Sequence, residues 1–328
     1  MDPSFEVIMI IIAVIVFHVL IFRWLTRKSK DIYGKHVCIT GGSSGIGLWV
    51  AINAAKKGAD ITIVARNIKI LEKAVNVIKE NCVRNDQRIE YYSLDVASGH
   101  KNIQTSFKEI EEKLGDIYML VNCAGMAICG TIEDTKPEDA KFMMDLNYLG
   151  TVYPIQYVLP KMKAKKDGII VLTSSQGGLI GIYGMAAYNA TKFALRGFAE
   201  ALSMETKHLG INITLSLPAD TDTPGFANEQ KSKPKITQEI CSGGGLFKPE
   251  DVGKKLLDDA LKGNFFSIMG IESWILTILC VGMSPWKNPI LGFLQCYLMG
   301  VLRMISFGIQ WNFGRIVRKY DKPKEKSN

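Results

Sequence analysis

Apolar and polar positions follow two alternating patterns along the central part of the chain. Short apolar runs are typical of buried strands, and clear examples are residues 36–39, 60–65 and 211–217. The segments between such runs carry apolar residues at helical spacing, as in residues 193–202. Strands that alternate with helices are typical of a parallel sheet. The pattern therefore predicts an α/β fold, with a doubly wound parallel sheet in a single catalytic domain at residues 29–270.

The N-terminal apolar stretch, residues 5–25, is long enough to cross a bilayer, since about twenty helical residues span the hydrocarbon core. Acidic residues precede it and basic residues follow it, a charge asymmetry that places the C-terminal side in the cytosol. A cleaved signal peptide would have cations in front and a small-residue cleavage site behind, and neither is evident. We therefore predict an uncleaved membrane anchor at residues 1–28, rather than a cleaved signal or a buried helix.

Two more apolar stretches, residues 271–283 and 290–309, follow the predicted domain. The first is short for a membrane span and the second contains Arg303. A re-entrant hairpin, an interfacial pair and two helices that grip the bilayer all fit this pattern. The alternative is an amphipathic tail that packs on the domain or on a second copy. We assign residues 271–328 to membrane-associated segments that end in a basic tail, which suits an anionic cytosolic leaflet.

A glycine-rich turn, Thr40–Gly47, lies between the first predicted strand and the first predicted helix of the domain. Glycines let a backbone approach a pyrophosphate, whose charge the helix N-terminus stabilises. The spacing is Gly-x-x-x-Gly-x-Gly, and an ordinary loop rich in Gly and Ser is the alternative. The strand, turn and helix together predict a Rossmann-type dinucleotide fold. The predicted cofactor contacts in the turn are Gly41, Ser43, Ser44, Gly45, Ile46 and Gly47.

The second predicted strand ends at Arg66, at about the distance from the glycines where a dinucleotide fold meets the adenosine ribose. NAD sites carry an acid there that binds the ribose 2′-hydroxyl. This chain has Arg66, followed by Lys69, and a guanidinium suits a 2′-phosphate. The sequence therefore favours NADPH as the cofactor. An exposed surface cation is the alternative interpretation of Arg66.

Tyr188 and Lys192 lie four residues apart in a segment with helical spacing, so we expect both side chains on one helix face. The ammonium favours phenolate, and we expect it to lower the tyrosine pKa from about 10. A phenol with such a pKa is a proton donor. Chance often produces this pair, but its position after a glycine-rich turn indicates an active site.

The glycine turn and the Tyr188/Lys192 pair resemble those of the short-chain dehydrogenase/reductase family, over about residues 33–265. The resemblance implies a role for Asn147, which matches the helix asparagine that holds a water in the family's proton relay. It also implies further cofactor contacts at strand ends, from Asp95, Asn122, Ala124 and Gly125.

The family's catalytic serine lies thirteen residues before the tyrosine, which selects Ser175. Ser174 is the alternative if the preceding strand ends in a bulge. The mechanism that the resemblance implies needs no metal: Ser175 and Tyr188 hydrogen-bond a ketone oxygen, nicotinamide delivers hydride, and Tyr188 gives up its proton. Lys192 lowers the tyrosine pKa, binds the nicotinamide ribose and connects through water to Asn147.

A narrower resemblance lies in Pro218–Phe226, which follows the strand at residues 211–217. The family binds the nicotinamide amide here, through Thr221 and Thr223, and begins its substrate lid, which we place at residues 228–249 as a mobile segment. Pro218–Phe226, together with Ser174–Gln176 and the hydrophobic ends, resembles the branch of the family that reduces long-chain 3-ketosphingoid bases at the cytosolic face of the endoplasmic reticulum membrane. Such an amphiphile dissolves poorly in water, which suits an enzyme anchored in the bilayer.

Composition excludes some other functions. The net charge of +8 would suit a nucleic-acid partner, but much of the excess flanks the apolar ends and no nucleic-acid motif accompanies it. Seven Cys without CxxC spacing suit a reducing compartment without structural disulfides, and four His form no metal-ligand pattern. A membrane-bound steroid or retinoid oxidoreductase and a catalytically silent membrane scaffold are the alternative functions. A homo-oligomer is left open.

Overall fold

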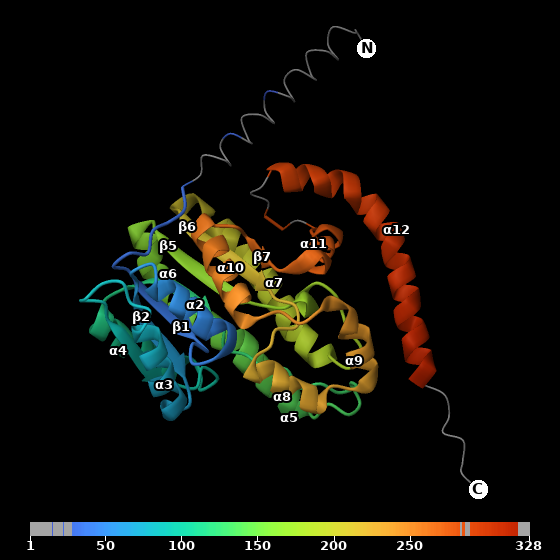
Figure 1. Cartoon of the computed structure of the whole chain (residues 1–328), viewed down its shortest axis with the longest axis horizontal. Helices are drawn as coiled ribbons and strands as arrows, with labels where there is room; N and C mark the ends of the chain where they lie inside the picture. Colours follow the sequence, from blue (N-terminus) through green and yellow to red (C-terminus); the bar gives the residue numbers. More distant parts are fainter. Residues whose placement is uncertain (1–14, 16–21, 23–27, 283, 286–288, 321–328) are drawn as a thin grey trace.

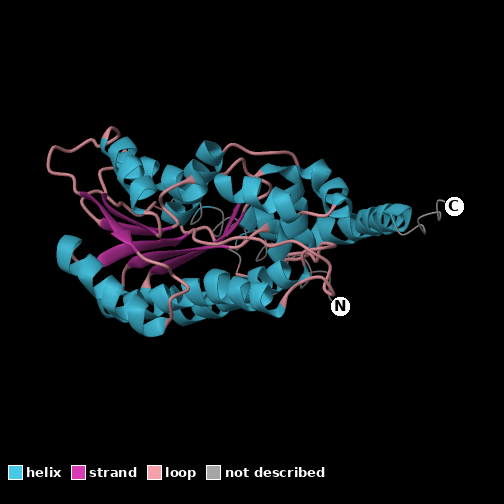
Figure 2. Cartoon of the chain, turned by 90° about the horizontal axis from the view of Figure 1, so that it is seen from below, coloured by secondary structure: helices cyan, strands magenta, loops and turns pink. Residues whose placement is uncertain are grey.

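Seven parallel strands form one sheet in the order β3-β2-β1-β4-β5-β6-β7, with helices on both faces (Figures 1 and 2). The computed structural model describes residues 28–282, 284–285 and 289–320, together with Ile15 and Phe22. The strands are β1 (His36–Thr40), β2 (Asp60–Ala65), β3 (Ile89–Ser93), β4 (Ile117–Asn122), β5 (Gly168–Thr173), β6 (Ile211–Leu217) and β7 (Phe266–Ile268). This arrangement confirms the predicted doubly wound, Rossmann-type sheet.

Two helical layers cover the sheet. One face packs against α2 (Gly45–Ala55), α3 (Ile68–Lys79) and α10 (Pro249–Lys262). The other face packs against α4 (His100–Leu114), α6 (Gly150–Lys165) and α7 (Ala186–Thr206). Successive side chains of a strand point to opposite faces, so Val37 and Ile39 enter the first layer and Cys38 enters the second. Because both faces are buried, the strands are continuous apolar runs rather than alternating ones.

The strand order reverses between β1 and β4, and ligands of open α/β sheets bind at such a point, beyond the carboxyl ends of the strands. Thr40 pairs with Asn122 at the ends of these two strands. The glycine turn leaves β1 here, and the segment Cys123–Gly125 leaves β4 beside it. The topology thus brings two predicted cofactor segments together that lie about eighty residues apart in the chain.

The segment that we expected to be a lid, residues 228–249, is largely helical rather than an irregular interruption. Thr223 caps the first of its helices by accepting a hydrogen bond from the Phe226 nitrogen at 3.1 Å. Thr237 in the second donates to the Tyr183 carbonyl at 2.8 Å, which holds that helix on the domain. The mobility of the segment stays a prediction.

The shorter helices of the fold are α5 (Pro137–Met143), the π-helix η1 (Met144–Leu149), the 3-10 turns η2 (Gln176–Gly178), η3 (Lys207–Leu209) and η4 (Ser242–Gly244), α8 (Pro224–Ser232) and α9 (Lys235–Cys241).

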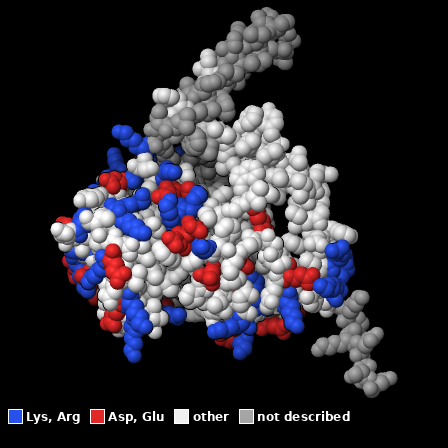
Figure 3. All heavy atoms as spheres, viewed as in Figure 1, with Lys and Arg blue, Asp and Glu red and all other residues white. Residues whose placement is uncertain are grey.

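The two C-terminal apolar stretches have different surroundings. The first forms α11 (Gly270–Leu279), which packs on the domain and buries Ser273 and Ile278 completely. The second forms α12 (Pro289–Tyr320), whose apolar side chains are mostly exposed and which lies along one side of the domain (Figure 1). The side of α12 seen in Figure 3 is largely without charged residues up to its C-terminal end. Among the described residues, α12 has the length and apolar composition that a membrane span requires. The predicted anchor at residues 1–28 lies almost wholly outside the described residues.

Candidate active site

The glycine turn forms a cradle of backbone at the reversal of strand order. Gly41 has a φ of +68°, a left-handed conformation that favours glycine, and a Cβ there would lie 2.7 Å from the Ala124 nitrogen. A Cβ on Gly47 would lie 2.4 Å from the Gly41 carbonyl oxygen. The turn leads into α2, whose first N–H groups have no partners within the helix. Close backbone approach and a helix N-terminus both fit the pyrophosphate of a dinucleotide.

A cleft extends from the cradle past the carboxyl ends of β2, β3 and β4. The predicted cofactor contacts that line it are Gly41, Ser43, Ser44, Gly45, Ile46, Gly47, Arg66, Asp95, Ala124, Gly125 and Thr223. Tyr188, Lys192 and Thr221 line a second pocket, which shares Gly125 and Thr223 with the cleft.

Two predicted cofactor contacts lie outside both hollows. Lys69 is exposed in the first turn of α3. Asn122 is buried at the end of β4 and donates its amide to the Val171 carbonyl at 3.1 Å. The geometry therefore gives Asn122 a structural contact with the neighbouring strand, and a direct cofactor contact from either residue stays a prediction.

The charges along the described wall of the cofactor cleft come from Arg66 and Asp95. Arg66 is exposed at the end of β2, and its carbonyl accepts a hydrogen bond from Ser93 at 3.0 Å. Asp95 accepts a hydrogen bond from the Ala97 nitrogen at 3.0 Å, which holds the turn after β3. The end of β2 therefore presents a guanidinium where an NAD site presents an acid.

Helix α7 presents Tyr188 and Lys192 on one face, as predicted, with the Lys192 Nζ 5.5 Å from the centre of the Tyr188 ring. Lys192 is only 5% exposed, and its Nζ donates a hydrogen bond of 3.0 Å to the carbonyl of Thr173. Thr173 is the last residue of β5. The lysine thus joins the helix to the end of the sheet beside the cofactor cleft.

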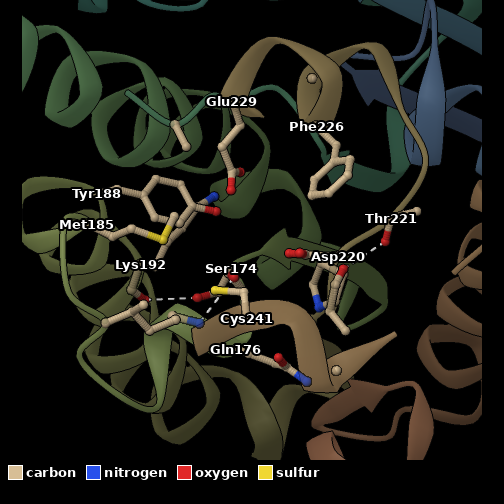
Figure 4. A pocket seen from close by; sticks show the side chains of 18 of the residues that line it. Ser174, Gln176, Met185, Tyr188, Lys192, Asp220, Thr221, Phe226, Glu229 and Cys241 are labelled. Atoms are coloured by element: carbon tan, nitrogen blue, oxygen red, sulfur yellow. Dashed lines mark hydrogen bonds between the residues drawn. The ribbon is translucent and has the colours of Figure 1, made fainter. Parts of the chain in front are cut away.

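The two candidate serines after β5 have different partners. The Ser174 hydroxyl is buried and donates to the Lys192 carbonyl at 2.9 Å, away from the phenol (Figure 4). The Ser175 hydroxyl lies close enough to the Tyr188 phenol to lower its pKa, and it accepts a hydrogen bond from the Gly177 nitrogen at 3.1 Å. The contact with the phenol favours Ser175, which the thirteen-residue spacing selected.

Our expectation that Lys192 lowers the pKa of Tyr188 is wrong for this structure. Burial raises the pKa of the phenol, the carboxylate of Glu229 raises it further, and the hydrogen bond with Ser175 opposes both effects. Burial also lowers the pKa of Lys192 to about 8. The reason is that desolvation disfavours the charged form of both groups. Burial therefore destabilises the phenolate by more than the neighbouring ammonium stabilises it.

Asn147 lies in the π-helix η1, between α5 and α6, and is 1% exposed. Its side chain clamps the backbone after β4, since its oxygen accepts from the Met126 nitrogen and its nitrogen donates to the Met126 carbonyl, both at 2.9 Å. The same nitrogen donates to Thr191 at 3.0 Å. Asn147 thus positions the strand end that lines both hollows, and a water relay to Lys192 stays a prediction.

Sequence analysis missed a charged wall in the second pocket. Lys233, whose side chain is 1% exposed, lies with its Nζ 3.0 Å from an oxygen of Glu229 and 3.5 Å from an oxygen of Asp220. All three residues line the same pocket as Tyr188. The spacing of Glu229 and Lys233 was visible in the sequence, but such a pair usually lies on a solvated helix face. Phe313 of α12 also lines this pocket.

Comparisons with known proteins agree with this geometry. Residues 35–234 match the family model described as short chain dehydrogenase. Among solved structures, levodione reductase superposes with a TM-score of 0.66 at 22% identity, covering 74% of this chain and 99% of that one. NAD+-bound xylitol dehydrogenase superposes with a TM-score of 0.65, also at 22% identity, covering 73% and 97%. At this level of identity the two structures show a shared fold.

More similar sequences cover nearly the whole chain. The 3-ketodihydrosphingosine reductase of Bos taurus is 41% identical over 92% of this chain and 91% of its own length. The 3-dehydrosphinganine reductase of Danio rerio is also 41% identical, over 94% and 93%. A plant relative, the 3-dehydrosphinganine reductase TSC10A of Arabidopsis thaliana, is 39% identical over 90% and 89%.

Proposed function

Because the chain belongs to the short chain dehydrogenase family, we propose that it reduces the ketone of 3-dehydrosphinganine to give sphinganine, a step of sphingolipid biosynthesis, with NADPH as the reductant. The observation that carries this proposal is similarity at 41% identity to reductases of that name over nine-tenths of both chains. The complete set of Ser175, Tyr188 and Lys192 in one pocket supports an active enzyme rather than a silent scaffold.

The side chains of the pocket suit proton transfer to a ketone oxygen. Tyr188 is protonated at neutral pH, since a phenol ordinarily titrates at about 10 and burial raises its pKa further, so it holds the proton that the product alcohol requires. Ser175 lies beside this phenol and acts on its pKa, and we expect its hydroxyl to hydrogen-bond the same substrate oxygen. When bound, the nicotinamide supplies the hydride. Lys192, held by the Thr173 carbonyl, would bind the adjoining ribose.

NADPH rather than NADH is the finer part of the proposal. The glycine turn and the N-terminus of α2 would hold the pyrophosphate, and Arg66 would bind the 2′-phosphate. The end of β2 carries no acid that would bind a free ribose 2′-hydroxyl.

The direct test is oxidation of NADPH by the purified full-length protein, followed with 3-dehydrosphinganine, with a steroid ketone and without substrate. We expect oxidation with the sphingoid ketone and formation of sphinganine. Turnover of the steroid ketone alone would support the alternative oxidoreductase instead. Absence of turnover with both ketones, in protein that binds NADPH, would support the silent scaffold.

We propose that the enzyme works on the cytosolic face of the endoplasmic reticulum membrane and that α12 holds it there. Exposed apolar side chains such as Val301, Met304 and Ile305 run along this helix, while its Phe313 lines the substrate pocket. A lipid ketone would then pass from the leaflet to the pocket along the same helix. The assignment of residues 271–328 to a membrane-associated region is part of this proposal, although α11 packs on the domain.

Removal of residues 1–27 tests the role of α12. We expect the shortened protein to stay with membranes after an alkaline carbonate wash, and the further change of Val301, Met304 and Ile305 to Asp to release it. A shortened protein that is soluble without the three substitutions would leave the N-terminal stretch as the anchor.

A further inference from the structure

The substrate pocket contains more carboxylates than its own lysines neutralise. Its acidic and basic side chains are those of Asp220, Glu229, Glu272, Lys233 and Lys192. The carboxylates of Asp220 and Glu229 share the single ammonium of Lys233, at 3.5 and 3.0 Å. The Lys192 ammonium donates a hydrogen bond to the Thr173 carbonyl and acts on the Glu229 carboxylate only through its charge. Two carboxylates thus share one close cation: Glu229, whose side chain is 13% exposed, at the shorter distance, and Asp220, whose side chain is 33% exposed, at the longer.

Glu229 is the carboxylate nearest to the chemistry. It projects from α8 into the pocket, and Figure 4 shows its carboxylate pointing toward the phenol end of Tyr188. Its side chain is 13% exposed, and its Oε1, although 3.0 Å from the Lys233 Nζ, accepts no hydrogen bond of good geometry from the described residues. Its charge is felt at the reacting group, because the carboxylate raises the pKa of the Tyr188 phenol.

We propose that Glu229 binds the ammonium group of an aminoketone substrate and so selects ketones that carry a cation on the neighbouring carbon. The inference rests on the proposed function. In 3-dehydrosphinganine the amino group is bonded to the carbon beside the ketone, so a substrate oxygen at Tyr188 brings an ammonium within reach of the adjacent wall. Substrate binding supplies Glu229 with a cation of its own, because the ammonium of Lys233 is shared between Glu229 and Asp220.

Geometry assigns the other charged groups supporting roles. Asp220, at the start of the segment after β6, keeps Lys233 in place when Glu229 turns to the substrate. Lys233 also lies 5.5 Å from the centre of the Phe226 ring, which fixes it against α8. Glu272 at the start of α11 is exposed at the edge of the pocket and is less suited to a desolvated cation.

The experiment compares two substrates in three proteins: wild type, Glu229→Gln and Glu239→Gln. Glu239 is a matched control, because it lies in the neighbouring helix α9 and pairs with Lys319, outside the pocket. The substrates are 3-dehydrosphinganine and the same hydroxyketone with hydrogen in place of the amino group. NADPH affinity and the thermal midpoint of each protein show whether it is folded.

We expect Glu229→Gln to lower kcat/KM for the aminoketone by about 10- to 100-fold, the effect of one charge-assisted hydrogen bond, and to leave the hydroxyketone unchanged or improved. Glu239→Gln should match wild type with both substrates.

An equal loss with both substrates in folded Glu229→Gln would overturn the inference and make Glu229 a structural partner of Lys233. If Glu229→Gln does not fold, Glu229→Asp, which keeps the charge, must retain the wild-type preference for the aminoketone, and loss of that preference would also overturn it. Wild type that reduces neither ketone would contradict the proposed function itself, a result distinct from these.

Discussion

The proposed cofactor side and the proposed substrate side of this site are built from different parts of the polypeptide. The cofactor cleft is largely backbone and glycine, and its central turn is one continuous segment, Thr40–Gly47. The substrate pocket is made of side chains from distant segments, among them Tyr188 in α7, Glu229 in α8 and Phe313 in α12. A backbone cradle suits a pyrophosphate that is the same in every dinucleotide, whereas a wall of charged side chains suits one particular substrate.

Tyr188→Phe should have the largest effect and should separate the two sides. The substitution removes the proton donor and leaves the cradle intact, so we expect turnover to fall about 100- to 10,000-fold, the usual contribution of a general acid. NADPH affinity, measured by fluorescence titration, should stay close to wild type. Tyr183→Phe is the control, because Tyr183 does not line the pocket and is expected to keep full activity. Retention of a tenth of the wild-type rate by Tyr188→Phe would mean that another group donates the proton.

Gly47→Ala should produce the reverse result by damaging the cofactor side alone. Its Cβ would meet the Gly41 carbonyl oxygen at 2.4 Å, and the backbone has to move to relieve the contact. We expect NADPH affinity to fall about 100-fold, at the upper end of the effect of overpacking, together with a lower thermal midpoint. Gly197→Ala is the control, since a Cβ there meets nothing within 4 Å, and it should leave affinity unchanged. Normal NADPH binding by Gly47→Ala would show that the cofactor does not use this cradle.

Arg66→Asp should change which cofactor is preferred. A charged hydrogen bond is worth about 1.5–3 kcal/mol, so we expect about a tenfold to hundredfold loss of kcat/KM with NADPH and little loss with NADH. Lys69→Ala is a useful comparison, because Lys69 is exposed in α3 and outside the cleft. A larger effect from Lys69→Ala than from Arg66→Asp would move the 2′-phosphate contact to α3.

A smaller effect is expected from pH, at the point where the two sides meet. Lys192 has a pKa lowered to about 8 by burial, whereas burial raises the pKa of Tyr188. As pH rises through about 8, Lys192 is therefore the first of the pair to lose its proton. We expect kcat/KM for NADPH, which reports the free enzyme, to fall by about tenfold for each pH unit above this value.

Lys192→Arg checks the assignment of this titration, because a guanidinium stays protonated over the whole range. The variant should lose the alkaline fall even if its rate at neutral pH is lower. A fall with the same midpoint in Lys192→Arg would assign the titration to another group.

The local geometry that sequence analysis predicted for the site depends on short-range spacing. A strand, a glycine turn and a helix follow one another within Val37–Ala55, so the cradle needs no distant contact to be identified. Tyr188 and Lys192 share a helix face because their spacing matches the helical period. The alternation of strands and helices likewise indicated the doubly wound sheet, since each element carries its own apolar pattern.

Other properties depended on what the fold brings together. The roles of Ser174 and Ser175 follow from contacts with α7, and the pKa direction of Tyr188 follows from desolvation and from Glu229, which no spacing rule relates to it. Both C-terminal stretches were similarly apolar in sequence, yet α11 packs on the domain and α12 stays exposed. Local sequence thus determined the elements and the cofactor cradle. The tertiary structure alone decided burial, charge balance and the composition of the substrate pocket, because these properties depend on neighbours far away along the chain.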